Sequence, residues 1–187
     1  MKRLHLVMCA IGLEFIAFGG WYVARSAPAK PTLSKLPWQT VLGTDKLPDH
    51  LTLVEFGDYQ CPPCRASAPK VALLEQTSQR PLVVMFRNYP LEMHIHAREL
   101  AELAETAKLH RDTDIHMRFM TQEINPAMLA VYQESIGTPD PQAVAIVDRD
   151  VFDANQLGIK STPTFLAVDE AGKVYVLPDP DSVNLIP

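Results

Sequence analysis

Two cysteines, Cys61 and Cys64, carry the clearest chemistry in this sequence, because their two-residue spacing is typical of a thiol–disulfide redox pair. A helix that begins at Cys61 would hold this sulfur at its N-terminus. Backbone N–H groups and the helix dipole there favour the thiolate that attacks disulfides. Pro62 suits the first helical position, where the amide hydrogen that proline lacks has no partner. A CxxC pair alone could equally hold a metal ion, so its context decides.

Two histidines, His94 and His96, are the candidate metal ligands that could join this pair. Side chains two residues apart at a helix start would diverge around the helix, and the cysteines lie across the predicted sheet. We therefore expect capping roles for these histidines, and we predict neither a metal nor a cofactor.

The elements around the cysteines predict an α/β sheet with a helical insertion. The apolar run Leu51–Gly57 is typical of a buried central strand, and a helix should follow from Cys61 to about Ser78. A strand is expected over Leu82–Arg87, and Trp38–Leu42 is interpreted as a first strand. A hairpin of strands at Thr164–Val168 and Val174–Leu177 should close the sheet.

Between about residues 94 and 158 the apolar residues recur at helical spacing. Here we expect a helix from about His94 and shorter helices at Ile115–Glu123, Ala127–Ile136 and Pro141–Leu157. On these helices His110, His116 and the acids Glu99, Glu102 and Glu105 are expected at the surface. Met117, Phe119 and Met120 should pack the insertion, and the alternative is that they line a peptide groove.

The N-terminal segment is predicted to target the chain to a membrane. Lys2 and Arg3 precede the apolar run Leu4–Val23, which is long enough to span a bilayer. A signal peptide cleaved after Ser26 is the alternative. We therefore expect an anchor or signal peptide over residues 1–26, a linker over 27–37 and one domain over 38–187. Both readings place that domain outside the cytoplasm.

The composition bounds the remaining possibilities. The 187 residues are 47% hydrophobic and carry a net charge of −5, although the first 30 residues are basic. An acidic domain without clustered Lys and Arg argues against nucleic-acid binding. Cys9 lies in the apolar segment, where it is interpreted as a small hydrophobic residue. The exported part then holds one cysteine pair, which points to a functional pair rather than a disulfide framework.

Three sequence stretches resemble the exported DsbA-like oxidoreductases of the thioredoxin superfamily. They are Leu53–Cys64, Phe86–Leu91 with His94–Ala97, and Gly158–Phe165, and they occur in the family's order. The resemblance implies a thioredoxin-like fold with an α-helical insertion between the half that contains the CxxC pair and the hairpin that follows a cis-proline.

The resemblance also assigns roles to individual residues. It implies that Cys61 is the exposed nucleophile, Cys64 the buried resolving thiol, and Pro163 a cis-proline whose preceding residue, Thr162, pairs with an extended substrate. It matches Glu55 to a buried acid that would have a raised pKa and shuttle the Cys64 proton. The alternative for Glu55 is a strand residue that faces an edge.

The prolines between the cysteines suggest a moderate redox strength. Pro63 lacks the N–H group that would support a Cys61 thiolate, and no histidine lies between the cysteines. The remaining support would come from the Cys64 N–H, the helix dipole and Arg65, so we predict a milder oxidant than the strongly oxidising members. Pro62 and Pro63 are also expected to contact substrate.

The sequence therefore predicts a periplasmic or otherwise extracytoplasmic thiol–disulfide oxidoreductase, anchored in the cytoplasmic membrane by residues 4–23. Its expected partners are protein or peptide thiols and disulfides, and a redox protein that resets Cys61 and Cys64. A dithiol oxidase is favoured. A reductase or isomerase, and a non-catalytic module that assembles an envelope partner, remain alternatives.

Overall fold

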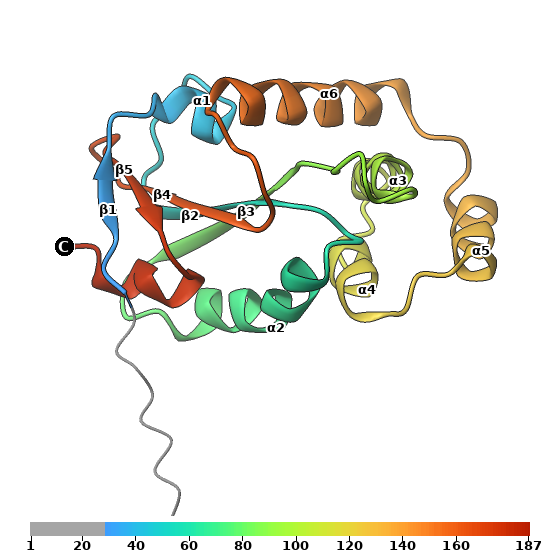
Figure 1. Cartoon of the computed structure of the whole chain (residues 1–187), viewed down its shortest axis with the longest axis horizontal. Helices are drawn as coiled ribbons and strands as arrows, with labels where there is room; N and C mark the ends of the chain where they lie inside the picture. The colour runs from blue at the N-terminus through green and yellow to red at the C-terminus, as the bar shows by residue number, and fades with distance from the viewer. Residues whose placement is uncertain (1–28) are drawn as a thin grey trace, which may run out of the picture.

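A mixed five-stranded sheet lies between helices in the computed structural model, which describes residues 29–187 (Figure 1). The strands are β1 (Thr32–Ser34), β2 (Leu51–Gly57), β3 (Leu82–Asn88), β4 (Thr164–Val168) and β5 (Val174–Leu177), in the spatial order β1-β5-β4-β2-β3. β2 is parallel to β3 and antiparallel to β4, so it is buried on both faces in the centre of the sheet.

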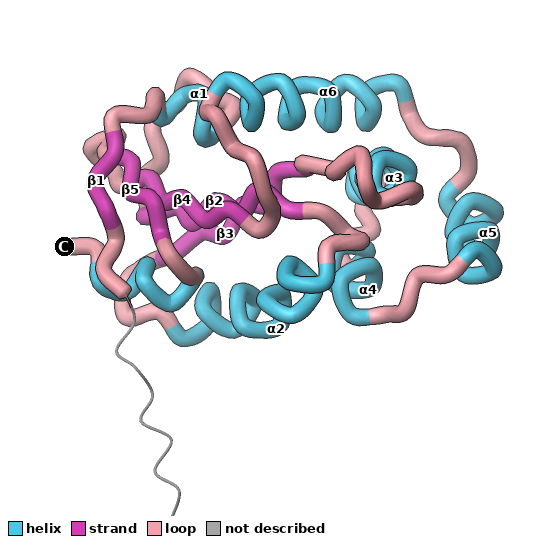
Figure 2. Tube along the Cα trace, in the orientation of Figure 1, coloured by secondary structure: helices cyan, strands magenta, loops and turns pink. Residues whose placement is uncertain are grey.

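Six α-helices and one 3-10 helix surround the sheet within residues 29–187 (Figure 2). They are α1 (Trp38–Leu42), α2 (Pro62–Thr77), α3 (Ala97–Leu109), α4 (Ile115–Thr121), α5 (Pro126–Ile136), α6 (Pro141–Gln156) and η1 (Pro180–Leu185). α2 lies along one side of the sheet and α1 with α6 along the other, while α3, α4 and α5 gather at the end far from β1 (Figure 1).

Alternation along β2 sends its side chains into two different cores. Leu51 and Leu53 pack with Val71 and Leu74 of α2 on one face. On the other face Val54 and Phe56 pack against α1 and against Ala154 of α6. A third core lies among the insertion helices and includes Cys61, Cys64 and Phe119. The cysteines therefore lie where the insertion meets the sheet.

The predicted architecture is confirmed in its main elements. The two hairpin strands have the expected bounds, α2 begins one residue after Cys61, and four helices occupy the predicted insertion. After the hairpin comes η1, whose N-cap Asp179 accepts a hydrogen bond from the Ser182 amide.

Two predictions near the start of the domain are wrong. Trp38–Leu42 is a short helix rather than a strand, and Gly43 ends it in the left-handed conformation at φ 65°. Part of the expected linker, Thr32–Ser34, is a strand that pairs with β5. Such short segments depend on the tertiary surface that receives them, so local propensity predicts them poorly.

No helix within residues 29–187 is long and apolar enough to cross a membrane. The predicted anchor over residues 4–23 and Cys9 lie outside the described residues.

Candidate functional site

Cys61 is the N-cap residue of α2, as its spacing from the preceding strand predicted. Pro62 occupies the first helical position, and the Cys61 carbonyl accepts a hydrogen bond from the Arg65 amide at 3.1 Å. The two cysteines are free thiols, and the Cys61 sulfur donates to the Thr162 carbonyl at 3.3 Å. The helix start thus points the first sulfur at the loop before β4.

The expectation of an exposed Cys61 is wrong for the residue as a whole. Cys61 keeps 4% of its surface, whereas the adjoining Pro62 and Pro63 are exposed. The loop at Thr162 lies against the sulfur and accounts for part of this burial. Cys64 is completely buried, as the resemblance implied. A protein thiol could therefore reach the pair only at the Cys61 side.

The peptide bond between Thr162 and Pro163 is cis, in agreement with the resemblance. It directly precedes β4, which begins at Thr164, so the central sheet holds it next to the cysteines. Thr162 is 9% exposed, and its buried hydroxyl oxygen has no hydrogen-bond partner among residues 29–187. Its carbonyl is the atom that meets the Cys61 sulfur.

Glu55 is a buried acid in the middle of the sheet, which excludes the alternative of an edge-facing residue. It pairs with Phe86 on β3 and with Phe165 on β4, and it is 2% exposed. Its Oε1 atom has no hydrogen-bond partner in the part of the chain that the structure describes. Burial raises the Glu55 pKa from 4.5 to about 8, and the Ser67 hydroxyl opposes this shift only in part.

Burial also raises the pKa of the Cys64 thiol. The neighbouring Cys61 sulfur and the Glu55 carboxyl raise the pKa further, while a backbone hydrogen bond at Asp58 lowers it. Glu55 and Cys64 therefore influence one another electrostatically. A proton that leaves one of these groups makes proton release from the other more costly.

The loop before Cys61 is held by the carboxylate of Asp58, which is 2% exposed. Its Oδ1 accepts from the Gln60 amide at 2.7 Å, and its Oδ2 accepts from the Leu91 amide at 2.8 Å and lies 2.7 Å from His94 Nδ1. His96 is the N-cap residue of α3, and its amide donates to Gln60. The two histidines thus connect the insertion to the cysteine loop.

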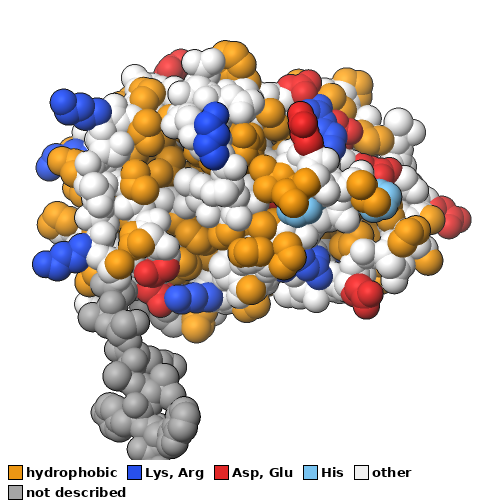
Figure 3. All heavy atoms as spheres, viewed as in Figure 1, with side chains coloured by type: hydrophobic (Ala, Val, Ile, Leu, Met, Phe, Trp, Pro, Cys, Tyr) orange, Lys and Arg blue, Asp and Glu red, His pale blue; other side chains and the backbone are white. Residues whose placement is uncertain are grey.

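No group of three or more His, Cys, Asp or Glu side chains that could hold a metal occurs between residues 29 and 187. The loop of His94 and His96 also exposes Met93 and Ile95 strongly, at 78% and 84%. Figure 3 shows hydrophobic side chains beside two histidines on the drawn face of the molecule.

Arg65 has a role that the sequence did not predict. Its guanidinium donates to the backbone carbonyls of Tyr59, Phe119 and Gln122, and so it fastens the first turn of α2 to the last turn of α4. The expectation was support for a Cys61 thiolate. Instead, the positive charge satisfies carbonyls that the helix end leaves without partners.

A buried charge network on the opposite face of the sheet was also missed. Arg87 of β3 forms an ion pair with Asp150 of α6 at 2.7 Å and with Asp153 at 2.6 Å. Asn88 donates to Asp150 and to Glu105. Glu105 is buried, whereas the sequence predicted that it would be exposed to solvent. The signal in the sequence was the polar pair Arg87 and Asn88 at the end of an apolar strand, since buried charges need partners.

An aromatic cluster joins α4 to the sheet. The Tyr59 ring lies 5.2 Å from Phe86, 5.5 Å from Phe119 and 5.6 Å from His116. His116, which was expected at the surface, is therefore half-buried against these rings, and burial lowers its pKa to about 4. Phe119 and Met120 are buried as predicted, and His110 is exposed.

No protein-family model and no curated protein matches the chain. Solved structures do match it. A thioredoxin-like oxidoreductase from Silicibacter pomeroyi is 20% identical, with a TM-score of 0.60 over 79% of this chain and 95% of that one. A periplasmic thioredoxin-like protein from Salmonella enterica serovar Typhimurium is also 20% identical, with a TM-score of 0.60 over 83% and 91%.

DsbA2 from Pseudomonas aeruginosa is 20% identical, with a TM-score of 0.56 over 70% of this chain and 81% of that one. Identities this low support a shared fold and nothing more specific. Together with the cis Thr162–Pro163 bond beside Cys61, they show that the chain has the thioredoxin-like fold of DsbA-like proteins.

Proposed function

We propose that the chain is an extracytoplasmic thiol–disulfide oxidoreductase that acts as a dithiol oxidase on protein substrates through Cys61 and Cys64. One observation carries the proposal: the Cys61 sulfur lies at the start of α2 and contacts the carbonyl that precedes a cis-proline. That carbonyl and the exposed Pro62 and Pro63 offer an extended substrate contacts beside the reactive sulfur.

The reaction starts from the Cys61–Cys64 disulfide. A substrate thiolate attacks the Cys61 sulfur, the bond between the two cysteines breaks, and Cys64 leaves as a thiolate that takes up a proton. A second substrate thiolate attacks the substrate sulfur of this mixed disulfide and releases Cys61 as a thiolate. The substrate loses two electrons, and a partner disulfide must later accept them from the Cys61–Cys64 dithiol.

Glu55 is proposed to hold and return the proton of Cys64. A carboxyl with a pKa of about 8 exchanges protons near neutral pH, and its charge raises the pKa of the Cys64 thiol. Burial alone would keep Cys64 protonated, so a nearby acceptor speeds the reverse step, in which Cys64 must become a thiolate. Glu55 is thus proposed to act in both directions of exchange.

The direction and place of action rest on the sequence. The two prolines between the cysteines favour a milder oxidant, and residues 4–23 are proposed to anchor the domain on the outer side of the cytoplasmic membrane. A reductase or isomerase would use the same residues in reverse. Rapid alkylation of thiols in intact cells separates these roles, because an oxidase keeps the pair mostly as a disulfide and a reductase mostly as a dithiol.

Exchange itself is tested with a reduced, unfolded protein that contains several cysteines. The oxidised chain should remove substrate thiols at a rate that disappears in Cys61→Ser. The remaining Cys61 thiolate of Cys64→Ser should instead accumulate the mixed disulfide when the same substrate is supplied in its oxidised form, because its attack on a substrate disulfide releases one substrate thiolate and no Cys64 follows to resolve the product. If cells that carry Cys61→Ser keep the phenotype of cells with the unchanged chain, the alternative of a non-catalytic assembly module replaces the proposal.

A further inference from the structure

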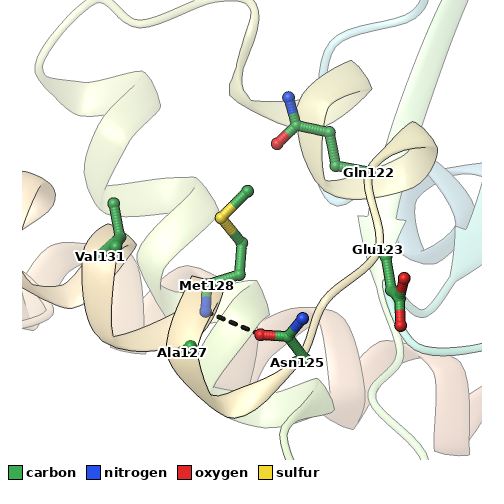
Figure 4. A pocket seen from close by; sticks show the side chains of 6 residues that line it. All are labelled: Gln122, Glu123, Asn125, Ala127, Met128 and Val131. Atoms are coloured by element: carbon green, nitrogen blue, oxygen red, sulfur yellow. Dashed lines mark hydrogen bonds between the residues drawn. The ribbon is translucent and has the colours of Figure 1, made fainter.

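An apolar hollow lies on the insertion, between the loop that joins α4 to α5 and the first turns of α5. It has a volume of about 560 Å³ and is lined by Gln122, Glu123, Asn125, Ala127, Met128 and Val131. Figure 4 shows Met128 and Val131 rising from α5 on the side that faces Gln122. Val131 is 57% exposed, although valine has a hydrophobic side chain that is usually buried.

A second hollow lies between the loop before Cys61 and the loop that follows α4. The second hollow has a volume of about 180 Å³, and its lining runs from Gln60 and Arg65 to Glu123 and Ile124. Glu123 lines both hollows. Gln60 directly precedes Cys61, so the two hollows together, called the path below, extend from the loop before the reactive cysteine to the apolar side chains of α5.

The walls of this path are fixed by hydrogen bonds. Arg65 ties the end of α4 to α2 through the Phe119 and Gln122 carbonyls. The Tyr132 hydroxyl donates to the Gln122 side chain, and the Asn125 side chain caps α5 by accepting from the Met128 amide at 3.0 Å. A surface held in this way costs little conformational entropy when it binds.

The path also carries an unbalanced charge. Glu123 is exposed where the two hollows meet, and it forms no ion pair with any lysine, arginine or histidine between residues 29 and 187. The only basic side chain in its hollow, Arg65, is bonded to carbonyls. A ligand along the path would therefore gain from a lysine or arginine opposite Glu123.

We propose that this path binds the extended polypeptide of a substrate, with an apolar side chain against Met128 and Val131 and a basic residue beside Glu123. The inference rests on the proposed function, since it assigns the substrate class for the Cys61 site: an unfolded segment whose cysteine is followed or preceded by a basic and then an apolar residue. Apolar contact area supplies the affinity and Glu123 supplies the selectivity.

The test uses the full chain and synthetic peptides with one cysteine, one lysine and one leucine at varied distances on either side of the cysteine. For each peptide, the rate of reaction with the Cys61–Cys64 disulfide is divided by the rate with glutathione. In Val131→Glu this ratio should fall about tenfold for the best peptide, as for loss of a central interface contact. Phe152→Glu, an equally exposed apolar position on α6, is the control and should leave the ratio unchanged.

Glu123→Lys should transfer the preference from lysine to glutamate peptides. Equal ratios in the wild type, Val131→Glu and Glu123→Lys would overturn the path. A separate measurement, fluorescence anisotropy of the same peptide with serine in place of cysteine, reports binding without exchange. If the chain does not react with glutathione but binds the serine peptide, and Val131→Glu weakens that binding, the proposed function is overturned and the path stays in place. If the chain neither binds the peptide nor reacts, both are overturned.

Discussion

Two buried carboxylates, Glu55 and Asp150, lie on opposite faces of the same sheet and differ in one respect. Both Asp150 oxygens are bonded, Oδ1 to the Arg87 guanidinium and Oδ2 to the backbone and side-chain amides of Asn88. Glu55 has an oxygen with no partner within residues 29–187 and a pKa raised to about 8. Burial is almost the same, at 4% and 2% exposure, so pairing makes the difference.

The comparison separates structural from chemical use of a buried charge. A charge with a complete set of partners fixes the position of the elements that supply them, here β3, α1 and α6. A carboxyl without them exchanges its proton in the neutral pH range, which suits proton transfer. The sheet thus keeps stability and reactivity on separate faces.

The largest effect is expected when Asp150 is removed. Asp150→Ala leaves Arg87 buried without its main partner, and we expect a loss of about 3–5 kcal/mol in the free energy of unfolding, measured by urea denaturation. The exchange rate of the molecules that remain folded should not change. Asp148→Ala on the same helix is the control, because the Asp148 side chain is 61% exposed. A similar loss in both variants would refute the structural role of Asp150.

The next effect is a pH dependence of stability caused by Glu55. Its pKa is higher in the folded chain than the ordinary value of 4.5, so the folded state keeps a proton that the unfolded state has released between pH 4.5 and about 8. Stability contributed by this proton is complete below pH 4.5 and is lost as the pH rises to 8. In Glu55→Gln this loss, of the order of a few kcal/mol, should be absent.

Urea denaturation at pH 5, 7 and 9 measures this difference. The wild type should lose stability relative to Glu55→Gln at each step, and at pH 9 the variant should be the more stable protein. Parallel curves would show that Glu55 finds a partner when it ionises, which would refute the contrast with Asp150.

The burial of Glu55 could be predicted from the sequence and that of Asp150 could not, because only Glu55 has a local signal. Glu55 interrupts an apolar strand close to the cysteines, so its burial follows from the strand pattern and its role from the resemblance. Asp150 lies on an amphipathic helix among other acids, and nothing local distinguishes it from Asp148 or Asp153. Its partner Arg87 is 63 residues away, so the pair exists only through the packing of α6 on the sheet.

The same limit explains the other errors. The burial of Cys61 depends on a loop 101 residues later, and Thr32–Ser34 becomes a strand because β5 offers it an edge. Periodicity and turn residues were enough for α2, the hairpin and the insertion helices, whose signals are local. Contacts between distant segments determine exposure and pairing, and those require the fold.

A smaller effect is expected on the rate of exchange. If Glu55 moves the Cys64 proton, Glu55→Gln should slow the attack of Cys64 on a mixed disulfide by about 10²-fold at pH 7, the low end for a lost acid–base catalyst. Stopped-flow mixing of the reduced chain with a peptide disulfide, under excess peptide, measures this step. The pH profile distinguishes proton transfer from altered packing, because only proton transfer removes the inflection near pH 8.

The smallest effect concerns a third carboxylate, Asp181, which is paired but exposed. Lys70 Nζ lies 2.7 Å from its Oδ2, and the two side chains are 47% and 42% exposed. Water screens such a pair, so Lys70→Ala should cost about 0.5 kcal/mol, and the difference from wild type should shrink in 1 M salt. Denaturation at both salt concentrations measures it. A loss as large as that of Asp150→Ala would mean that pairing alone sets how much a carboxylate contributes to the free energy of unfolding. The small loss expected here means that pairing stabilises strongly only where burial removes water.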